Sequence, residues 1–105
     1  MTGVTYKGTR GENDAPHVTK QTDDLPPEPI NPRLDLARHA DGVNWGYFGS
    51  GCRQLAVALL ADVLGDDDAT TLSQRFKADV VCRLPWEGFE ITAEAVERLF
   101  DKEET

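Results

Sequence analysis

Residues 51–65 read GCRQLAVALLADVLG, and this stretch decides the fold. On a helical wheel of 100° per residue its apolar side chains cover a broad arc, which is typical of a helix buried on most sides. The arc consists of Cys52, Leu55, Ala56, Leu59, Leu60, Val63 and Leu64. Gly65 predicts the end of this helix, because glycine adopts C-cap backbone conformations at little cost. We therefore expect a central helix with other elements packed around it.

A second helix is expected directly after Gly65. Three aspartates, residues 66–68, would lie in its first turn, where the helix dipole favours negative charge. Its inner face would consist of Ala69, Leu72, Phe76 and Val80. Asp79 and Arg83 have the spacing of an i,i+4 ion pair, and Pro85 predicts the end of the helix.

Short strands are expected on both sides of the helical region. Residues 4–10 alternate and are rich in β-formers, residues 11–16 are typical of a turn, and residues 17–21 fit a return strand. Residues 86–91 predict another strand, with Phe89 and Ile91 on one face.

A third helix is expected after Thr92, which is a favourable N-cap residue. Glu94 and Arg98 would pair on its outer side. Its apolar stripe consists of Ala95, Val96, Leu99 and Phe100. Together these elements predict an α+β fold, a small and mostly antiparallel sheet with two or three helices packed on one face.

The segment 25–32 contains four prolines within seven residues, which predicts an extended strap lying on the body of the protein. Residues 33–40 are ambiguous. Asn31-Pro32 is typical of a helix start, whereas Leu34 and Leu36 alternate with polar residues as in a strand. We favour a short helix or a turn there. The 105 residues correspond to one domain, 1–105, with ends at 1–3 and 102–105 that should fray.

The composition excludes several classes of protein. The formal charge is −8, which argues against direct binding of nucleic-acid phosphates, and the longest nearly apolar run is far too short to cross a membrane. No targeting segment is visible, so we expect a cytoplasmic location. Asp outnumbers Glu (11 to 8) and Arg outnumbers Lys (7 to 4). This acidic composition suits a halophilic cytoplasm with molar salt; an acidic mimic of nucleic acid is the alternative.

The turn at residues 43–51 contains the densest group of unusual residues, VNWGYFGSG. A glycine-rich turn before a helix can be purely structural, with Ser50 capping the helix that follows. It can also bind an anion or nucleotide, with Arg53 as the nearby cation, although no P-loop lysine is present. The third alternative is a docking surface for a protein. The candidate binding residues are Trp45, Tyr47, Phe48, Gly49, Ser50, Gly51 and Arg53.

The motif WGYFGSG at residues 45–51, with QLAVALL at residues 54–60, resembles the signature of a family of small uncharacterised proteins from bacteria, archaea, phages and mobile elements. That family has a WGYGGSGP core, an opening similar to residues 6–10 and a Phe-Lys segment similar to residues 75–77. Here Phe48 stands in place of a glycine and Cys52 in place of the proline. The resemblance covers about residues 6–100 and implies no activity.

Other candidate sites are weaker. Asp66, Asp68 and Thr70 begin like a calcium-binding loop, but Thr71 and Lys77 break that pattern. His17 and His39 do not have the spacing of metal ligands. His39 precedes the aromatic turn, residues 43–51, closely enough to be considered as a general base. Cys52 and Cys82 predict neither a zinc site nor a disulfide. We therefore expect no catalytic residues, no metal and no cofactor.

These patterns favour a soluble accessory or protein-interaction module of halophilic or mobile-element origin rather than an enzyme. Its partner would be a protein, with no direct contact to nucleic acid or membrane. The alternatives are an acidic nucleic-acid mimic that binds a basic protein, and a binder of small anions or nucleotides at the glycine turn, residues 46–51.

Overall fold

The computed structural model describes residues 3–101 and contains a four-stranded sheet. Strand β1 (Val4–Arg10) pairs with β2 (Pro16–Thr22) across a connection that includes the short 3-10 turn η1 (Glu12–Asp14). Strand β4 (Gly88–Thr92) pairs with the other side of β1, and β3 (Glu28–Pro29) pairs with β2. The order β3-β2-β1-β4 is antiparallel throughout.

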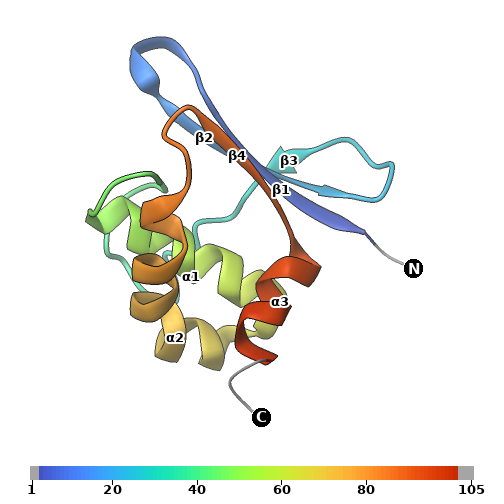
Figure 1. Cartoon of the computed structure of the whole chain (residues 1–105), viewed down its shortest axis with the longest axis vertical. Helices are drawn as coiled ribbons and strands as arrows, with labels where there is room; N and C mark the ends of the chain where they lie inside the picture. Colours follow the sequence, from blue (N-terminus) through green and yellow to red (C-terminus); the bar gives the residue numbers. More distant parts are fainter. Residues whose placement is uncertain (1–2, 102–105) are drawn as a thin grey trace.

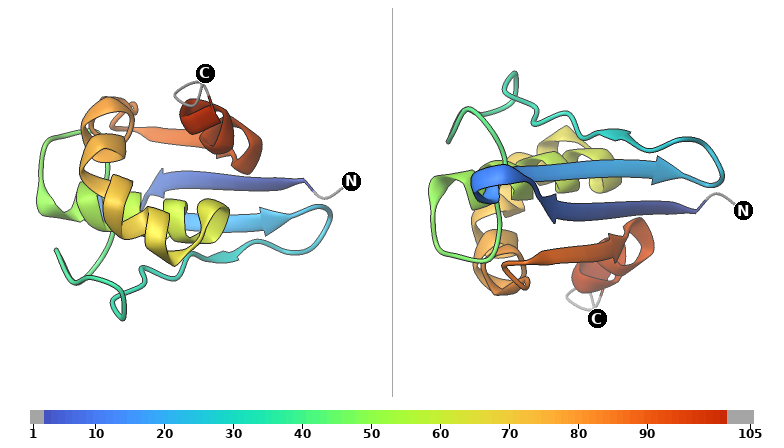
Figure 2. Two further views of the ribbon diagram at one scale, coloured as in Figure 1. Left: turned by 90° about the horizontal axis from the view of Figure 1, so that it is seen from below. Right: turned by 90° about the horizontal axis from the view of Figure 1, so that it is seen from above.

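Three α-helices lie on one face of this sheet (Figure 1). They are α1 (Ser50–Leu64), α2 (Asp66–Asp79) and α3 (Ala93–Asp101), and the 3-10 turn η2 (Val81–Arg83) follows α2. α1 and α2 form an antiparallel hairpin at Gly65, so the start of α1 and the end of α2 lie at the same end of the molecule (Figures 1 and 2). The α+β fold class predicted from the sequence is confirmed.

The core lies between α1 and the sheet. Most of α1 between residues 51 and 61 is buried, as its wide apolar arc predicts. The sheet contributes Tyr6, Val18 and Phe89, while α2 contributes Ala69 and Phe76. The hydroxyl of Tyr6 donates a hydrogen bond to Asp62, and Lys20 Nζ lies 2.8 Å from the other carboxylate oxygen of Asp62. These two contacts fix the end of α1 against β1 and β2.

The second helix is shorter than predicted. It ends at Asp79, and the predicted Asp79–Arg83 ion pair is wrong, because Asp79 pairs with Arg75 at 3.6 Å instead. The carbonyl of Val81 accepts a hydrogen bond from the backbone N–H of Gly46 at 3.1 Å. That contact holds residues 81–83 against the aromatic turn in a 3-10 conformation.

The third helix begins and pairs as predicted. The hydroxyl of Thr92 accepts a hydrogen bond from the backbone N–H of Ala95 at 3.1 Å, which confirms it as the capping residue. Arg98 and Glu94 are 2.9 Å apart on the outer side. The preceding strand starts at Gly88, so Trp86 lies before the strand rather than in it.

The strap, residues 25–32, runs along β2 and contributes β3 to the sheet edge (Figure 2). Its end is bonded to β2 through the backbone N–H of Ile30 and the carbonyl of Val18 at 3.0 Å. Residues 33–40 contain a turn, closed by Leu36 N–H on the Arg33 carbonyl at 3.0 Å. At the chain ends, Gly3 donates a hydrogen bond to Asp23, whereas the predictions for residues 1–2 and 102–105 lie outside the described residues.

Candidate functional site

Trp45 is the buried foundation of the aromatic turn. Its side chain is fully buried, its ring meets Phe89 edge to face with centroids 5.0 Å apart, and its Nε1 donates to the carbonyl of Pro85 at 2.9 Å. Such a satisfied indole belongs to the core. The prediction that Trp45 belongs to a binding surface is therefore wrong.

Arg10 connects this turn to the residues before β4. Its guanidinium carbon lies 4.0 Å from the ring centroid of Trp45 and 3.7 Å from that of Trp86. The same group donates to the carbonyl of Trp86 at 2.9 Å and to the side chain of Asn44 at 2.7 Å. A planar guanidinium can stack on rings and donate in its plane at the same time, which lysine cannot do.

Two further bonds complete the Arg10 contacts, to the carbonyls of Asp14 at 3.2 Å and Trp45 at 3.0 Å. All four acceptors are neutral, so the positive charge of Arg10 is not cancelled at this end of the molecule. Sequence reasoning did not find this role. The available signal was an arginine at the end of β1, two strand positions after the buried Gly8.

Three aromatic side chains remain exposed around this foundation. Phe48 is 68% exposed, Tyr47 41% and Trp86 40%, and we call these three residues the aromatic patch. The rings of Tyr47 and Trp86 meet edge to face at 6.1 Å. Tyr47 and Phe48 were predicted from the sequence, whereas Trp86 was assigned to a strand.

Two glycines allow this arrangement. Gly46 has a φ of +81°, and a Cβ there would lie 3.0 Å from the Cα of Trp86. At Gly49 a Cβ would lie only 2.2 Å from the ring of Tyr47, so the ring can fold over the chain only because that position has no side chain. The glycines thus have the structural role that the sequence suggested.

The helix that follows begins without the expected cap. Gly49 is the N-cap residue and provides no side-chain bond, while Ser50 is exposed and already lies in α1. The capping role predicted for Ser50 is therefore wrong. Gly51 is buried, and its carbonyl accepts a bond from Asn44 N–H at 3.0 Å. Cys52 donates its thiol to the carbonyl of Tyr47 at 2.9 Å, so the helix start and the turn are joined.

Two cations lie beside the start of α1. Arg53 Nε donates to the hydroxyl of Ser73 on α2 at 3.4 Å. Lys77, one helical turn after Ser73, is only 7% exposed, and its Nζ lies 4.1 Å from the centroid of the Phe48 ring. Burial lowers the pKa of His39 below its usual range, and the positive charges of Arg53 and Lys77 lower it further. The sequence identified Arg53 but missed Lys77, because a lysine at the edge of an apolar helix face is usually solvated.

Gln54 holds the loop that precedes the turn. This fully buried side chain accepts from the backbone N–H groups of His39 at 2.8 Å and Ala40 at 3.2 Å. It donates to the carbonyls of Pro32 at 2.7 Å and Ala37 at 2.9 Å. Every hydrogen-bonding position of the amide group is therefore used in fixing the loop.

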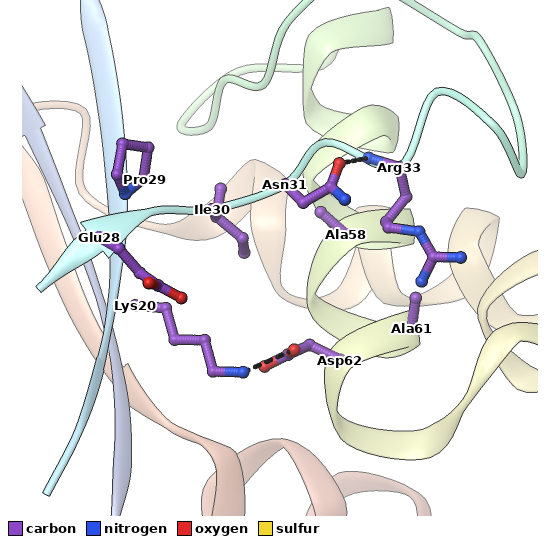
Figure 3. Close-up of a pocket in the computed structure, with 9 residues that line it drawn as sticks. All are labelled: Lys20, Glu28, Pro29, Ile30, Asn31, Arg33, Ala58, Ala61 and Asp62. Atoms are coloured by element: carbon purple, nitrogen blue, oxygen red, sulfur yellow. Dashed lines mark hydrogen bonds and ion pairs between the residues drawn. The ribbon is translucent and has the colours of Figure 1, made fainter.

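A hollow of about 310 Å³, which we call the strap pocket, lies between the strap, β2 and α1 (Figure 3). Lys20 reaches across it to Asp62, while Ala58 and Ala61 of α1 line its helical side. Arg33 at its rim pairs with Asp35 at 3.0 Å and Asp66 at 3.2 Å. Its two cations are therefore both used in ion pairs.

The remaining sequence predictions concern metal ligands, the two cysteines and a membrane span. Among the described residues, no group of three His, Cys, Asp or Glu side chains could hold a metal ion. Cys52 and Cys82 are free thiols, as predicted. Burial, followed by the nearby Cys52, raises the pKa of Cys82 above its usual range. Within residues 3–101 no helix has the length and apolar character needed to cross a membrane.

The fold and the site define a small α+β domain with an aromatic turn at one end. Residues 6–102 match the family of unknown function DUF6166, and the chain therefore belongs to that family. No curated protein and no solved structure matches the chain.

Proposed function

We propose that this protein is a non-catalytic interaction module that docks a partner protein through the aromatic patch. The observation that supports this proposal is the exposure of Tyr47, Phe48 and Trp86 on a backbone fixed from below by Trp45 and Arg10. Rigid, amphipathic aromatic side chains supply much of the binding energy of protein interfaces. A preorganised patch also loses little conformational entropy when it binds.

The charges around the patch indicate the chemistry of the partner. In the described part of the chain, Arg10, Arg53 and Lys77 have no carboxylate within ion-pairing distance, whereas Lys20, Arg33 and Arg38 each have at least one. Positive charge thus gathers beside the aromatic rings of an otherwise acidic protein. We infer that the docked segment carries both apolar and acidic side chains.

A binding role also fits the chemistry of the turn better than a catalytic one. Its thiol, Cys52, is buried and donates to a backbone carbonyl, so it is poorly placed for attack on a substrate. Ser50 lies in the first turn of α1 and is exposed to solvent.

The test is comparative affinity capture from the native host with three versions of the full chain. Wild type and Leu25→Ser should retain the same partner, and Phe48→Ser should lose it. Leu25 is a matched control, since it is an exposed apolar side chain, 62% accessible, on the strap. Equal capture by all three would contradict docking at the patch. Capture of basic nucleic-acid-binding proteins by all three would support the acidic mimic instead.

We further infer that the acidity is an adaptation to salt in a halophilic host. Asp and Glu outnumber Lys and Arg 19 to 11, and molar salt screens the resulting repulsion. The free energy of unfolding should therefore rise between dilute buffer and molar KCl. A constant or falling value would contradict a halophilic origin. The expected mobile-element origin rests on the family resemblance alone.

A further inference from the structure

Leu25 and Phe48 are the two most exposed large apolar side chains in the described part of the chain, at 62% and 68%. Phe48 belongs to the aromatic turn, whereas Leu25 lies in the connection between β2 and β3. Figures 1 and 2 show that these two segments lie on opposite sides of the molecule. One chain therefore cannot place its own Leu25 on its own Phe48, but two copies can make this contact.

The connection that contains Leu25 is preorganised for binding. We call residues 23–27 the proline tip; each of these residues is exposed, and the backbone N–H of Leu25 donates to the carbonyl of Thr22 at 3.0 Å. Pro26 and Pro27 fix their own φ angles and have no backbone donor that needs a partner. An extended proline segment of this kind loses little conformational entropy when it binds.

The chemistry of the proline tip complements that of the aromatic patch. The sequence of the tip, DDLPP, combines two acidic side chains with three apolar ones. Within the described residues, Asp24 has no ion-pair partner. Beside the patch, the described structure gives Arg10, Arg53 and Lys77 no carboxylate within ion-pairing distance either. Extended proline-rich segments dock on exposed aromatic side chains, so the tip matches the patch both in its apolar groups and in its charge.

We propose that the aromatic patch binds the proline tip of a second copy of this chain. Leu25 and the two prolines would lie on the exposed rings, and the two aspartates would face the positive charge beside them. Such a contact joins two different surfaces, so copies would associate head to tail, with a free patch at one end and a free tip at the other. This inference rests on the docking role proposed above and names the occupant of the patch.

The experiment is sedimentation velocity of the purified full chain over a range of concentrations. It is made in about 0.15 M KCl, where a Debye length of about 8 Å screens most of the repulsion between copies that each carry a charge of −8. The tip is short, so the contact belongs with small, transient interfaces, and we expect a dissociation constant of about 10–100 μM. The mean mass of wild type should therefore rise beyond that of a dimer as the protein approaches about 1 mM.

Single variants remove one surface at a time. Phe48→Ser and Leu25→Ser should each weaken self-association at least about tenfold. Leu99→Ser is the matched control, since Leu99 is 41% exposed on α3, outside both surfaces, and it should associate as wild type does.

Mixing the two variants tests the head-to-tail geometry. Phe48→Ser retains an intact tip and Leu25→Ser retains an intact patch, so each has one functional surface. An equimolar mixture should form a heterodimer with the affinity of the wild-type contact and no larger species. No contact that uses the same surface on both copies would give this pattern.

The charge contribution has a separate pair of variants. Asp24→Lys places a cation opposite the positive charge beside the patch and should weaken self-association severalfold. Glu90→Lys is the control, because Glu90 is exposed on β4 and its replacement changes the net charge by the same amount. Equal effects of the two variants would contradict the charge pairing.

Three results would overturn the proposal as a whole. The first is a monomeric wild type at about 1 mM, since contacts weaker than that are not specific. The second is self-association of Phe48→Ser or Leu25→Ser at the wild-type level. The third is a mixture of these two variants that stays monomeric, because it would show that the patch and the tip do not bind each other.

The outcome is separable from the docking of another protein. A monomeric wild type removes the second copy as the occupant and leaves the patch to a different partner, which the capture from the host detects. In that capture, native copies of this chain are counted apart from other proteins, because Phe48→Ser still binds them through its own tip. Head-to-tail association of the purified chain, with every other captured protein retained by Phe48→Ser, would support the second copy alone.

Discussion

The end of the molecule at the aromatic turn, which we call the turn end, and the side covered by the strap, which we call the strap side, both combine cationic and apolar side chains. They use them in opposite ways. At the strap pocket, Lys20 and Arg33 are each paired with carboxylates, and apolar groups such as Ala58 and Ala61 lie beneath them. At the turn end, Arg10 and Lys77 meet ring faces, Arg10 donates to neutral acceptors, and the three rings of the aromatic patch remain exposed beside them. On the strap side the charges are paired within the protein. The turn end retains unpaired positive charge and exposed apolar surface that a ligand can contact.

The largest expected effect tests whether the buried side chain of Trp45 stabilises the aromatic turn. Trp45→Ala removes a fully buried indole that packs on Phe89 and bonds to Pro85. Loss of such a side chain costs about 3–5 kcal/mol of unfolding free energy. Urea denaturation followed by circular dichroism measures this loss. A loss below about 1 kcal/mol would mean that the turn is held by other contacts.

The next prediction separates the charge of Arg10 from its geometry. Arg10→Lys keeps the charge but removes the planar group that stacks between Trp45 and Trp86. We expect a loss of about 1–2 kcal/mol, together with a change in tryptophan fluorescence. Arg38→Lys is the control, since the exposed Arg38–Asp41 pair should contribute less than about 0.5 kcal/mol. Equal losses in the two variants would contradict the geometric role of Arg10.

The strap side can be tested through Tyr6, whose hydroxyl donates to Asp62. Burial of the phenol, followed by its bond to Asp62 and the charge of that carboxylate, raises the pKa of Tyr6 far above its ordinary value of 10.0. The unfolded chain therefore releases this proton at a lower pH than the folded protein. Stability from this group is present below about pH 10 and is lost as the pH rises further.

Urea unfolding of wild type and Tyr6→Phe at pH 7 to 11 measures this effect. At pH 7 the variant should be less stable by about 1 kcal/mol, because it lacks the bond to Asp62. That difference should shrink above pH 10, since only wild type has a phenol that ionises on unfolding. The other ionisable groups are common to both proteins and cancel in the comparison. A constant difference across this range would contradict the raised pKa.

The sequence predicted the fold better than the site. The wide apolar arc of residues 51–65, the alternation of residues 4–10 and the Thr92 cap each depend on local spacing, and each is confirmed. The site depends on contacts between distant residues. Arg10 lies 35 residues from Trp45 and 76 from Trp86, and no local pattern specifies that stack.

Errors at the turn have the same origin. Trp45 was assigned to the surface because exposed and buried aromatics look alike in a glycine-rich stretch. Ser50 was assigned as a cap because a serine before a helix usually is one, whereas here α1 starts one residue earlier at the Gly49 cap. Lys77 was overlooked because its contact with the Phe48 ring joins two segments that are distant in the sequence.

The smallest expected effect on stability is the most informative about the exposed rings. Phe48→Ser removes a side chain that is 68% exposed, and Leu25→Ser removes one that is 62% exposed, so each should change the unfolding free energy by about 0.5 kcal/mol or less. If Phe48 existed to shield Lys77, its loss would instead destabilise the protein more than the loss of Leu25. Equal and small changes in urea denaturation would mean that the protein does not need the Phe48 ring in order to fold. A large exposed aromatic side chain that the fold does not require is then best explained by a ligand that binds it.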